Sequence, residues 1–350
     1  MAWGFCHSSS RSRGSESGIE AKSYGLGPVL LLGLAWMGAA CAGYGTGGAG
    51  LEFSADRPKT EFSGVRVLQN ERKLASDPAD DTEEDCPSVS ERLIPSLKAM
   101  GASIEEAPPD PQERVGVGTG APEAATVALL KGASSDPILL IAPYTEACSG
   151  RDPGSSQFGS AAFLLELGRV LSTHPMRYSI WLIFVPESAD EGGGPRQSGS
   201  LEPTPWPELT RVVSHFEQSG VLERVRVAIF FEGLGLPNSS AHRDSHSHPI
   251  YREVFWESAR DLGLTDLFPE DAVFASSPVG HQVLINEGLR RTVLVSTTAG
   301  SKTAEGSSRG GSGAEVQAFQ SVGDVSLEAI GRIQTRLERI DRLSARSEQG

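Results

Sequence analysis

The stretch 136–171, DPILLIAPYTEACSGRDPGSSQFGSAAFLLELGRVL, decides the fold of this chain. Residues 138–142 form a short, continuous apolar run, which is the pattern of a strand buried on both faces of a parallel sheet. A loop with turn residues follows, and a helix is predicted over 160–171. Functional groups in such α/β units lie where the carboxyl ends of the strands meet the loops, so we expect the site there.

The rest of the chain continues this alternation. The predicted fold class is therefore α/β, a three-layer arrangement of helices on both faces of a mostly parallel central sheet. Residues 125–130 are expected to pair with 138–142 as a hairpin, and Ser88 with Glu91 predicts a capping box at a helix start. Further strands are predicted at 115–117, 178–185, 225–231 and 292–296, and helices at 88–100, 206–219, 250–262 and 327–343.

Composition narrows the class of partner. With a formal net charge of −14, we expect no nucleic-acid partner, because phosphate binding needs a basic surface. Gly and Pro gather in the first 60 residues and near 190–205 and 299–314. Roughly 230–250 residues remain for one globular domain, enough for a sizeable core.

The N-terminus has the order of an export signal. Arg11, Arg13 and Lys22 precede an apolar run at 29–43 that ends in small residues. We interpret 1–42 as a secretory signal peptide, or as a lipoprotein signal with Cys41 as the lipidated residue. An uncleaved anchor is the third alternative, although the run is short for a membrane span. The expected location is the periplasm or cell envelope, with membrane contact only through this anchor or lipid.

The domain organisation follows from these segments. Residues 43–85 are Gly-rich and then acidic, which predicts a flexible linker, and 86–345 are expected to form the α/β domain. Cys86 and Cys148 lie in the exported part and are candidates for a disulfide.

The order of segments from about 88 to 344 resembles the co-catalytic zinc aminopeptidases, metallopeptidase family twenty-eight, with the glutaminyl cyclases as a branch. That family has His-Tyr-Asp after its first strand, then Pro-Gly-Ala-Asn/Thr-Asp, then Phe-Phe-Asp-Gly-Glu-Glu and Asp-x-x-Gly after later strands. The matching text here is Pro143-Tyr144-Thr145, Pro153-Gly-Ser-Ser-Gln157, Leu164-Leu-Glu-Leu-Gly-Arg-Val-Leu171, Ile183-Phe-Val-Pro-Glu187, Glu232-Gly-Leu-Gly235, Gly280-His281 and Leu327-Glu-Ala-Ile-Gly-Arg332. The resemblance implies a zinc-exopeptidase-like fold.

The metal positions of the family are mostly lost. Pro143 and Thr145 stand where the family has its first His and Asp, and Gln157 stands for the metal-bridging Asp. Glu187 is what remains of a Glu pair, Glu232 replaces the third Asp, and Thr297 and Thr298 replace the last His. Zinc activation of water needs at least three ligands and an open position. We therefore expect no metal, with zinc on Glu187 and Glu232 as the alternative.

A second constellation is the run His242-Arg-Asp-Ser-His246-Ser-His248. Three imidazoles and a carboxylate could chelate a metal ion. With no strand or helix beside it to set geometry, we favour an exposed, solvated loop. His281 is interpreted as a structural histidine at a loop rather than a catalytic one.

Two functional hypotheses follow. The first is a pseudoenzyme of the aminopeptidase fold, a non-catalytic accessory protein that binds a peptide or protein in a cleft formed by Tyr144, Gln157, Glu232 and His281. The alternative is an active zinc aminopeptidase or glutaminyl cyclase with a reduced metal site, in which Glu187 and His281 are catalytic. A third reading is a structural protein of the envelope.

Overall fold

Strand β3 (Ser134–Thr145) is the centre of the fold in the computed structural model of the chain. It pairs in parallel with β4 (Tyr178–Glu187) on one side and with β5 (Val227–Glu232) on the other. Its residues 137–144 are all buried, as the apolar run predicts. The structure describes residues 61–75, 88–106, 124–145, 158–187, 206–272, 274–275, 280–299 and 312–347, all within the compact unit 52–350.

The main sheet of the described chain has seven strands in the order β1-β2-β4-β3-β5-β9-β6. Its four central strands are parallel, and an antiparallel pairing closes each side. The remaining strands of this sheet are β1 (Ser103–Glu106), β2 (Thr126–Leu130), β9 (Thr292–Ala299) and β6 (Ser239–Ala241). Two further short strands, β7 (Arg243–Asp244) and β8 (Phe274–Ala275), pair with each other.

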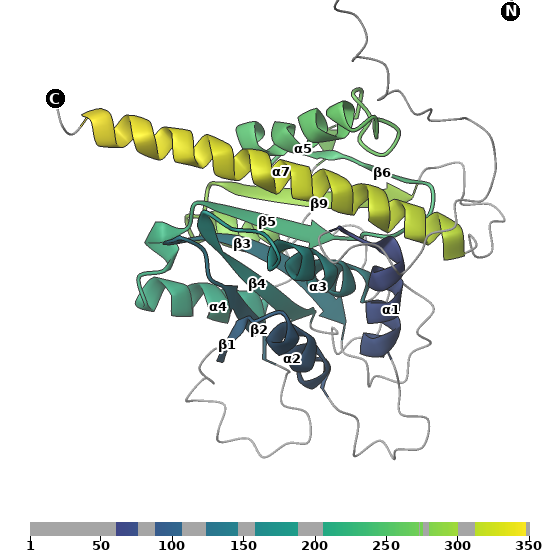
Figure 1. Ribbon diagram of the computed structural model, residues 1–350, viewed down its shortest axis with the longest axis horizontal. Helices are drawn as coiled ribbons and strands as arrows, with labels where there is room; N and C mark the ends of the chain where they lie inside the picture. Colours follow the sequence, from purple (N-terminus) through teal and green to yellow (C-terminus); the bar gives the residue numbers. More distant parts are fainter. Residues whose placement is uncertain are drawn as a thin grey trace, which may run out of the picture. The chain divides into compact units, whose positions relative to one another are not determined.

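Helices cover both faces of the sheet, which confirms the three-layer prediction. One core cluster joins alternate residues of the strands to α1, α2, α3, α5 and α7, and a second joins the other face to α4 and α6. Figure 1 shows the long helix α7 running across the sheet between α1 and α5. The helices are α1 (Gly64–Ala75), α2 (Val89–Ala99), α3 (Gly159–Leu171), α4 (Pro207–Gln218), α5 (Pro249–Asp261), α6 (His281–Asn286) and α7 (Ser312–Ser347), with a 3-10 turn at Leu222–Arg224.

Helix α1 corrects one expectation, because it lies inside the stretch that we expected to be a flexible linker. Its buried residues include Val67 and Leu74, and it packs on α3 and α7. Glu166 of α3, itself buried, accepts a hydrogen bond from the backbone N–H of Ser63 at 2.9 Å. Residues 61–75 therefore belong to the α/β domain, which begins upstream of residue 86.

A second correction concerns strand pairing. The structure pairs β2 with β4 in antiparallel register, with Thr126 opposite Phe184, so β2 and β3 do not form the expected hairpin. Sequential neighbours need not be spatial neighbours in an α/β sheet. The capping box is confirmed: the Ser88 hydroxyl accepts from Glu91 N, and the Glu91 carboxylate accepts from Ser88 N.

The N-terminal signal, the strand at 115–117, Gln157, Cys41, Cys86 and Cys148 lie outside the described residues. Among the helices of the described ranges, none is long and apolar enough to cross a membrane.

Candidate functional site

The carboxyl ends of the parallel strands lie side by side, and two acidic side chains stand there. Thr145 of β3 pairs with Glu187 of β4, and Glu232 of β5 pairs with Ser296 of β9. Alternation along each strand places both glutamates on the face of Val185 and Phe230, which belongs to the α4/α6 core cluster. β3 lies between β4 and β5; Glu187 pairs with Thr145, whereas the β3–β5 register continues with Glu232 opposite Pro143, two residues earlier. Two strand spacings and two residues of rise together separate the two glutamate backbones by roughly 12 Å. Both side chains are partly exposed.

Two described residues at positions matched to ligands of the resembled family differ in chemistry from those ligands. Pro143 has no ligand atom in its side chain, and the Thr297 hydroxyl already donates to the backbone oxygen of Gly233 at 2.7 Å. In the described part of the chain, the group of three metal-capable side chains close enough to share an ion is Asp244, His246 and His281. That group contains neither Glu187 nor Glu232.

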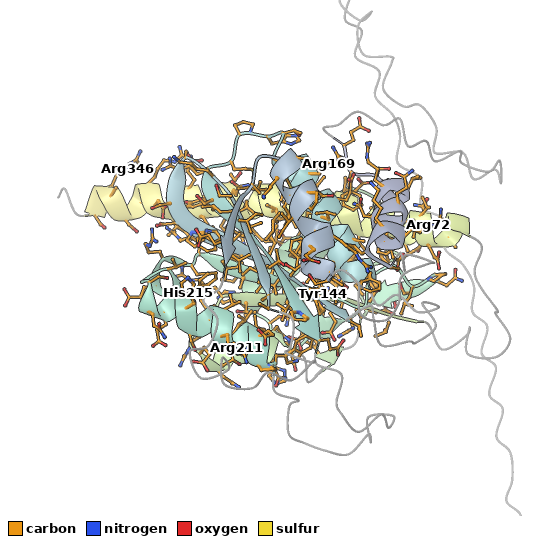
Figure 2. All side chains as sticks on the ribbon, turned by 90° about the horizontal axis from the view of Figure 1, so that it is seen from below. Arg72, Tyr144, Arg169, Arg211, His215 and Arg346 are labelled. Carbon is orange, nitrogen blue, oxygen red and sulfur yellow. The ribbon has the colours of Figure 1, made fainter. Side chains whose placement is uncertain are left out.

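Tyr144 has a different place from the one expected. Its side chain is only 1% exposed and belongs to the core cluster on the α3 side of the sheet. Figure 2, in which Tyr144 is labelled, shows it within the body of the molecule. Tyr144 therefore packs in the core on the face opposite to that of Glu187 and Glu232. A residue in this position does not line a cleft with the two glutamates.

The structure brings His281 to Asp244. His281 is the first residue of α6, and its Nε2 lies 3.1 Å from Oδ2 of Asp244. Both side chains have 0% exposure. His246 lies at the solvent side of this pair, with its Nδ1 3.7 Å from Oδ1 of Asp244 and its side chain 44% exposed. The ligand atoms of the three residues all lie within 4.8 Å of one another.

Backbone and side-chain donors fix the orientation of Asp244. Its Oδ2 accepts from the backbone N–H of Ser247 at 2.6 Å and from the Ser247 hydroxyl at 2.8 Å. The hydroxyl oxygen of Ser247 in turn accepts from the backbone N–H of Leu294 on β9. Arg252 of α5 donates to the backbone oxygen of Asp244. Strand β9 and helix α5 thus hold the carboxylate rigidly beneath His246.

The electrostatics of Asp244 reflect these donors. Burial alone would raise the pKa of its carboxyl, but the hydrogen bond and the electrostatic interaction with His281 and the donors of Ser247 outweigh burial and lower this pKa to about 2. Burial lowers the pKa of His242, against the opposing charge of Asp244. Asp244 is therefore an anion at neutral pH.

The prediction of an exposed, solvated loop at 242–248 is wrong. Asp244 and Ser247 are buried, the run contains β7, and it lies between β6 and the start of α5. His281 is likewise not a loop residue. Sequence reasoning identified the run as metal-capable, but it missed Ser247 and the link to His281. No local signal joins residues 37 positions apart.

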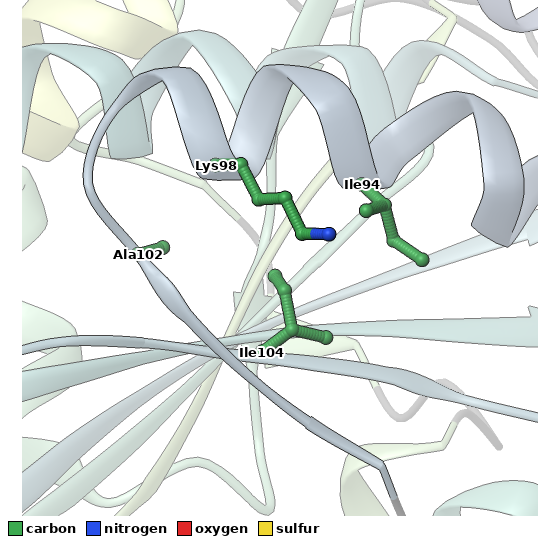
Figure 3. Close-up of a pocket in the computed structure, with 4 residues that line it drawn as sticks. All are labelled: Ile94, Lys98, Ala102 and Ile104. Carbon is green, nitrogen blue, oxygen red and sulfur yellow. The ribbon is translucent and has the colours of Figure 1, made fainter.

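A pocket of about 500 Å³ lies elsewhere, between α2 and β1 (Figure 3). Ile94 and Lys98 extend from α2 toward Ile104 of β1, and Ala102 completes the described lining. This lining has one cation and no acid–base pair. It lies at the β1 edge of the sheet, away from the ends of the parallel strands, so it has no part in the site.

Comparison with known proteins gives the fold. No protein-family model matches the sequence, and no curated protein matches it either. Solved structures do match. Acidobacteriales bacterium glutaminyl cyclase has a TM-score of 0.55 at 17% identity, covering 81% of this chain and 98% of that chain. Bacteroides thetaiotaomicron glutaminyl cyclase has a TM-score of 0.58 at 16% identity, covering 77% of this chain and 98% of that chain.

A third match is a Zn-dependent exopeptidase from Parabacteroides distasonis, with a TM-score of 0.51 at 18% identity, covering 82% of this chain and 99% of that chain. The chain thus has the fold shared by glutaminyl cyclases and zinc-dependent exopeptidases, which confirms the predicted fold class. At these identities the likeness shows the fold alone, and function has to be argued from the residues.

Proposed function

We propose that this protein binds a peptide or protein segment at the carboxyl edge of its parallel strands and does not hydrolyse or cyclise it. The observation that carries the proposal is the set of side chains at that edge. Pro143 stands near the end of β3 where the resembled family has a ligand, and the Thr297 hydroxyl donates to the backbone oxygen of Gly233. The described residues of this edge offer fewer than the three protein ligands of catalytic zinc sites, which supports binding without metal activation of water or of a substrate carbonyl.

The chemistry of the edge favours a cationic group on the bound segment. Glu187 and Glu232 are partly exposed carboxylates on the same face of the sheet. Carboxylates recognise ammonium groups through charge-assisted hydrogen bonds. A free peptide amino terminus carries such an ammonium group and is the expected ligand group.

A binding assay tests this proposal. Fluorescently labelled peptides with a free amino terminus should bind the purified protein, and amino-terminal acetylation should weaken binding at least tenfold. The double variant Glu187→Gln/Glu232→Gln should lose the preference for the free amine. Glu217→Gln, on the exposed face of α4, is the matched control. Equal binding of free and acetylated peptides would contradict the proposal, as would release of product from either.

The alternative is an active enzyme with zinc on Glu187 and Glu232. β3 separates these residues, and two carboxylates fall short of the three protein ligands of catalytic zinc sites. Turnover measurements with added zinc decide between the two functions.

We also propose that the domain is exported. The charged, apolar and small-residue order near the N-terminus supports this. Amino-terminal sequencing of the protein from its native cell should find a new end near Cys41. An intact N-terminus on cytosolic protein would contradict export.

A further inference from the structure

We propose that Asp244, His246 and His281 form a binding site for a divalent transition-metal ion of the zinc class, separate from the carboxyl edge of the sheet. Two imidazoles and one carboxylate are ligands that zinc takes in proteins. Ligands about 2.0–2.1 Å from a tetrahedral ion lie roughly 3.3 Å from one another. His281 Nε2 lies 3.1 Å from Oδ2 and His246 Nδ1 lies 3.7 Å from Oδ1 of the same carboxylate, and one ligand atom from each of the three residues lies within 4.8 Å of the others.

Two buried atoms of this cluster lack a hydrogen bond within the described residues: Oδ1 of Asp244 and Nδ1 of His281. A buried anionic oxygen without a donor is costly, because nothing replaces its lost hydration. An ion beside Oδ1 would supply the missing counter-charge. Binding of the ion by Nε2 of His281 would require this nitrogen to be unprotonated, so a neutral ring would carry its proton on Nδ1.

The site is preorganised on one side and open on the other. Ser247 holds Oδ2 with two donors, as outer partners hold ligating carboxylates in metal sites. His246 is 44% exposed, so an ion can enter past it, and a water molecule can complete the coordination. Only His246 has to adjust on binding.

The cluster contacts β9 at positions before the one that pairs with Glu232. Ser247 is bonded to the backbone of Leu294, and the His248 N–H donates to the backbone oxygen of Thr292. These are the first residues of β9, whereas Glu232 pairs with Ser296 further along the strand. The metal site therefore lies beside the amino half of β9 and does not depend on the peptide-binding proposal.

Equilibrium dialysis of the full chain against micromolar zinc, followed by elemental analysis, tests the site. We expect about one zinc ion per chain and a Co²⁺ derivative with the visible absorption of a low-coordinate site. His246→Ala, chosen because His246 is partly exposed, should weaken zinc binding at least tenfold, and Asp244→Asn should do the same. His174→Ala, at an exposed histidine at the end of α3, should bind like the wild type.

Far-ultraviolet circular dichroism shows whether each variant is folded, and His246→Ala remains informative if the buried Asp244→Asn does not fold. Less than a tenth of an equivalent of zinc in the wild type would overturn the proposal. Wild-type affinity in His246→Ala would also overturn it, because the ion would then be held elsewhere. Peptide binding that persists while zinc binding is lost separates this test from that of the proposed function.

Discussion

Asp244 and His281 are 37 residues apart in the chain, yet their side chains meet at 3.1 Å with no exposure to solvent. The contact joins β7 to the first turn of α6, and Ser247 ties it to β9. Among the described residues, Asp244, His246 and His281 thus gather beside the amino half of β9, and Glu187 and Glu232 lie at the ends of β4 and β5.

Glu166 should anchor α1 to the domain. It accepts from Ser63 N at 2.9 Å and from Arg169 Nε at 2.7 Å, and it is 1% exposed. Glu166→Ala leaves a buried N–H and two guanidinium groups without their acceptor, so we expect a loss of about 2–4 kcal/mol in the free energy of unfolding. Urea denaturation of the wild type and the variant measures this loss. Limited proteolysis of the variant should find cleavage within 61–75.

Glu328→Ala is the control for this prediction, because Glu328 pairs with Arg332 on the exposed face of α7. Such i,i+4 pairs contribute about 0.5 kcal/mol or less. Similar losses in the two variants would mean that Glu166 does not hold α1 in place.

Gly235 should tolerate no side chain. It has φ +88°, and a Cβ there would overlap the ring of Phe319, a core residue of α7. Gly235→Ala should cost about 3 kcal/mol from backbone strain and overpacking together. Gly288→Ala isolates the backbone strain, because Gly288 has φ +94° and open space around it. We expect about 1 kcal/mol there by thermal denaturation. Equal costs would show that Phe319 moves aside without loss.

Stability should fall with rising pH through the titration of Glu71. Burial, aided by the charge of Glu315 on α7, raises its pKa from 4.5 to about 7. Between these values the folded state keeps a proton that the unfolded state releases, so the free energy of unfolding decreases as pH rises through this window. Glu71→Gln should therefore gain stability over the wild type from pH 4.5 to 7 and hold that gain above pH 7.

Thermal melts of both proteins across pH 4.5–8 check this prediction. Glu315→Gln should shrink the pH-dependent difference, because it removes the neighbouring charge. A wild-type-to-Gln difference that stays constant with pH would show that Glu71 titrates at its ordinary value when folded.

The strands and helices of the α/β core were largely predictable, and the exceptions have physical causes. The run at 138–142 and the Ser88–Glu91 capping pair are local signals, and both led to the right elements. Helix α1 was missed because its few buried residues, such as Val67 and Leu74, stand among polar ones, and their burial depends on α3 and α7. The position of β2 beside β4 depends on the order of the whole sheet, which no local pattern fixes.

The candidate site was predictable in composition but not in arrangement. The Asp and His residues of 242–248 were visible as metal-capable, and Glu187 and Glu232 were expected at strand ends, where they lie. The burial of Asp244 and its contact with His281 come from tertiary packing of α5, α6 and β9, which spacing along the chain does not encode. The resemblance of the Pro143-Tyr144-Thr145 motif to the family predicts Tyr144 in the cleft. Alternation along β3 instead turns its side chain to the α3 side of the sheet.

The central claim, binding without catalysis on an exopeptidase fold, is tested most directly by turnover. The full chain, loaded with one equivalent of zinc, should be incubated with an aminoacyl anilide and with a peptide that begins with glutamine. We predict no product above the protein-free control, and no difference between the wild type and Glu187→Gln or Glu232→Gln. Turnover that scales with protein concentration, disappears on metal removal and is lost in Glu187→Gln or Glu232→Gln would contradict the account.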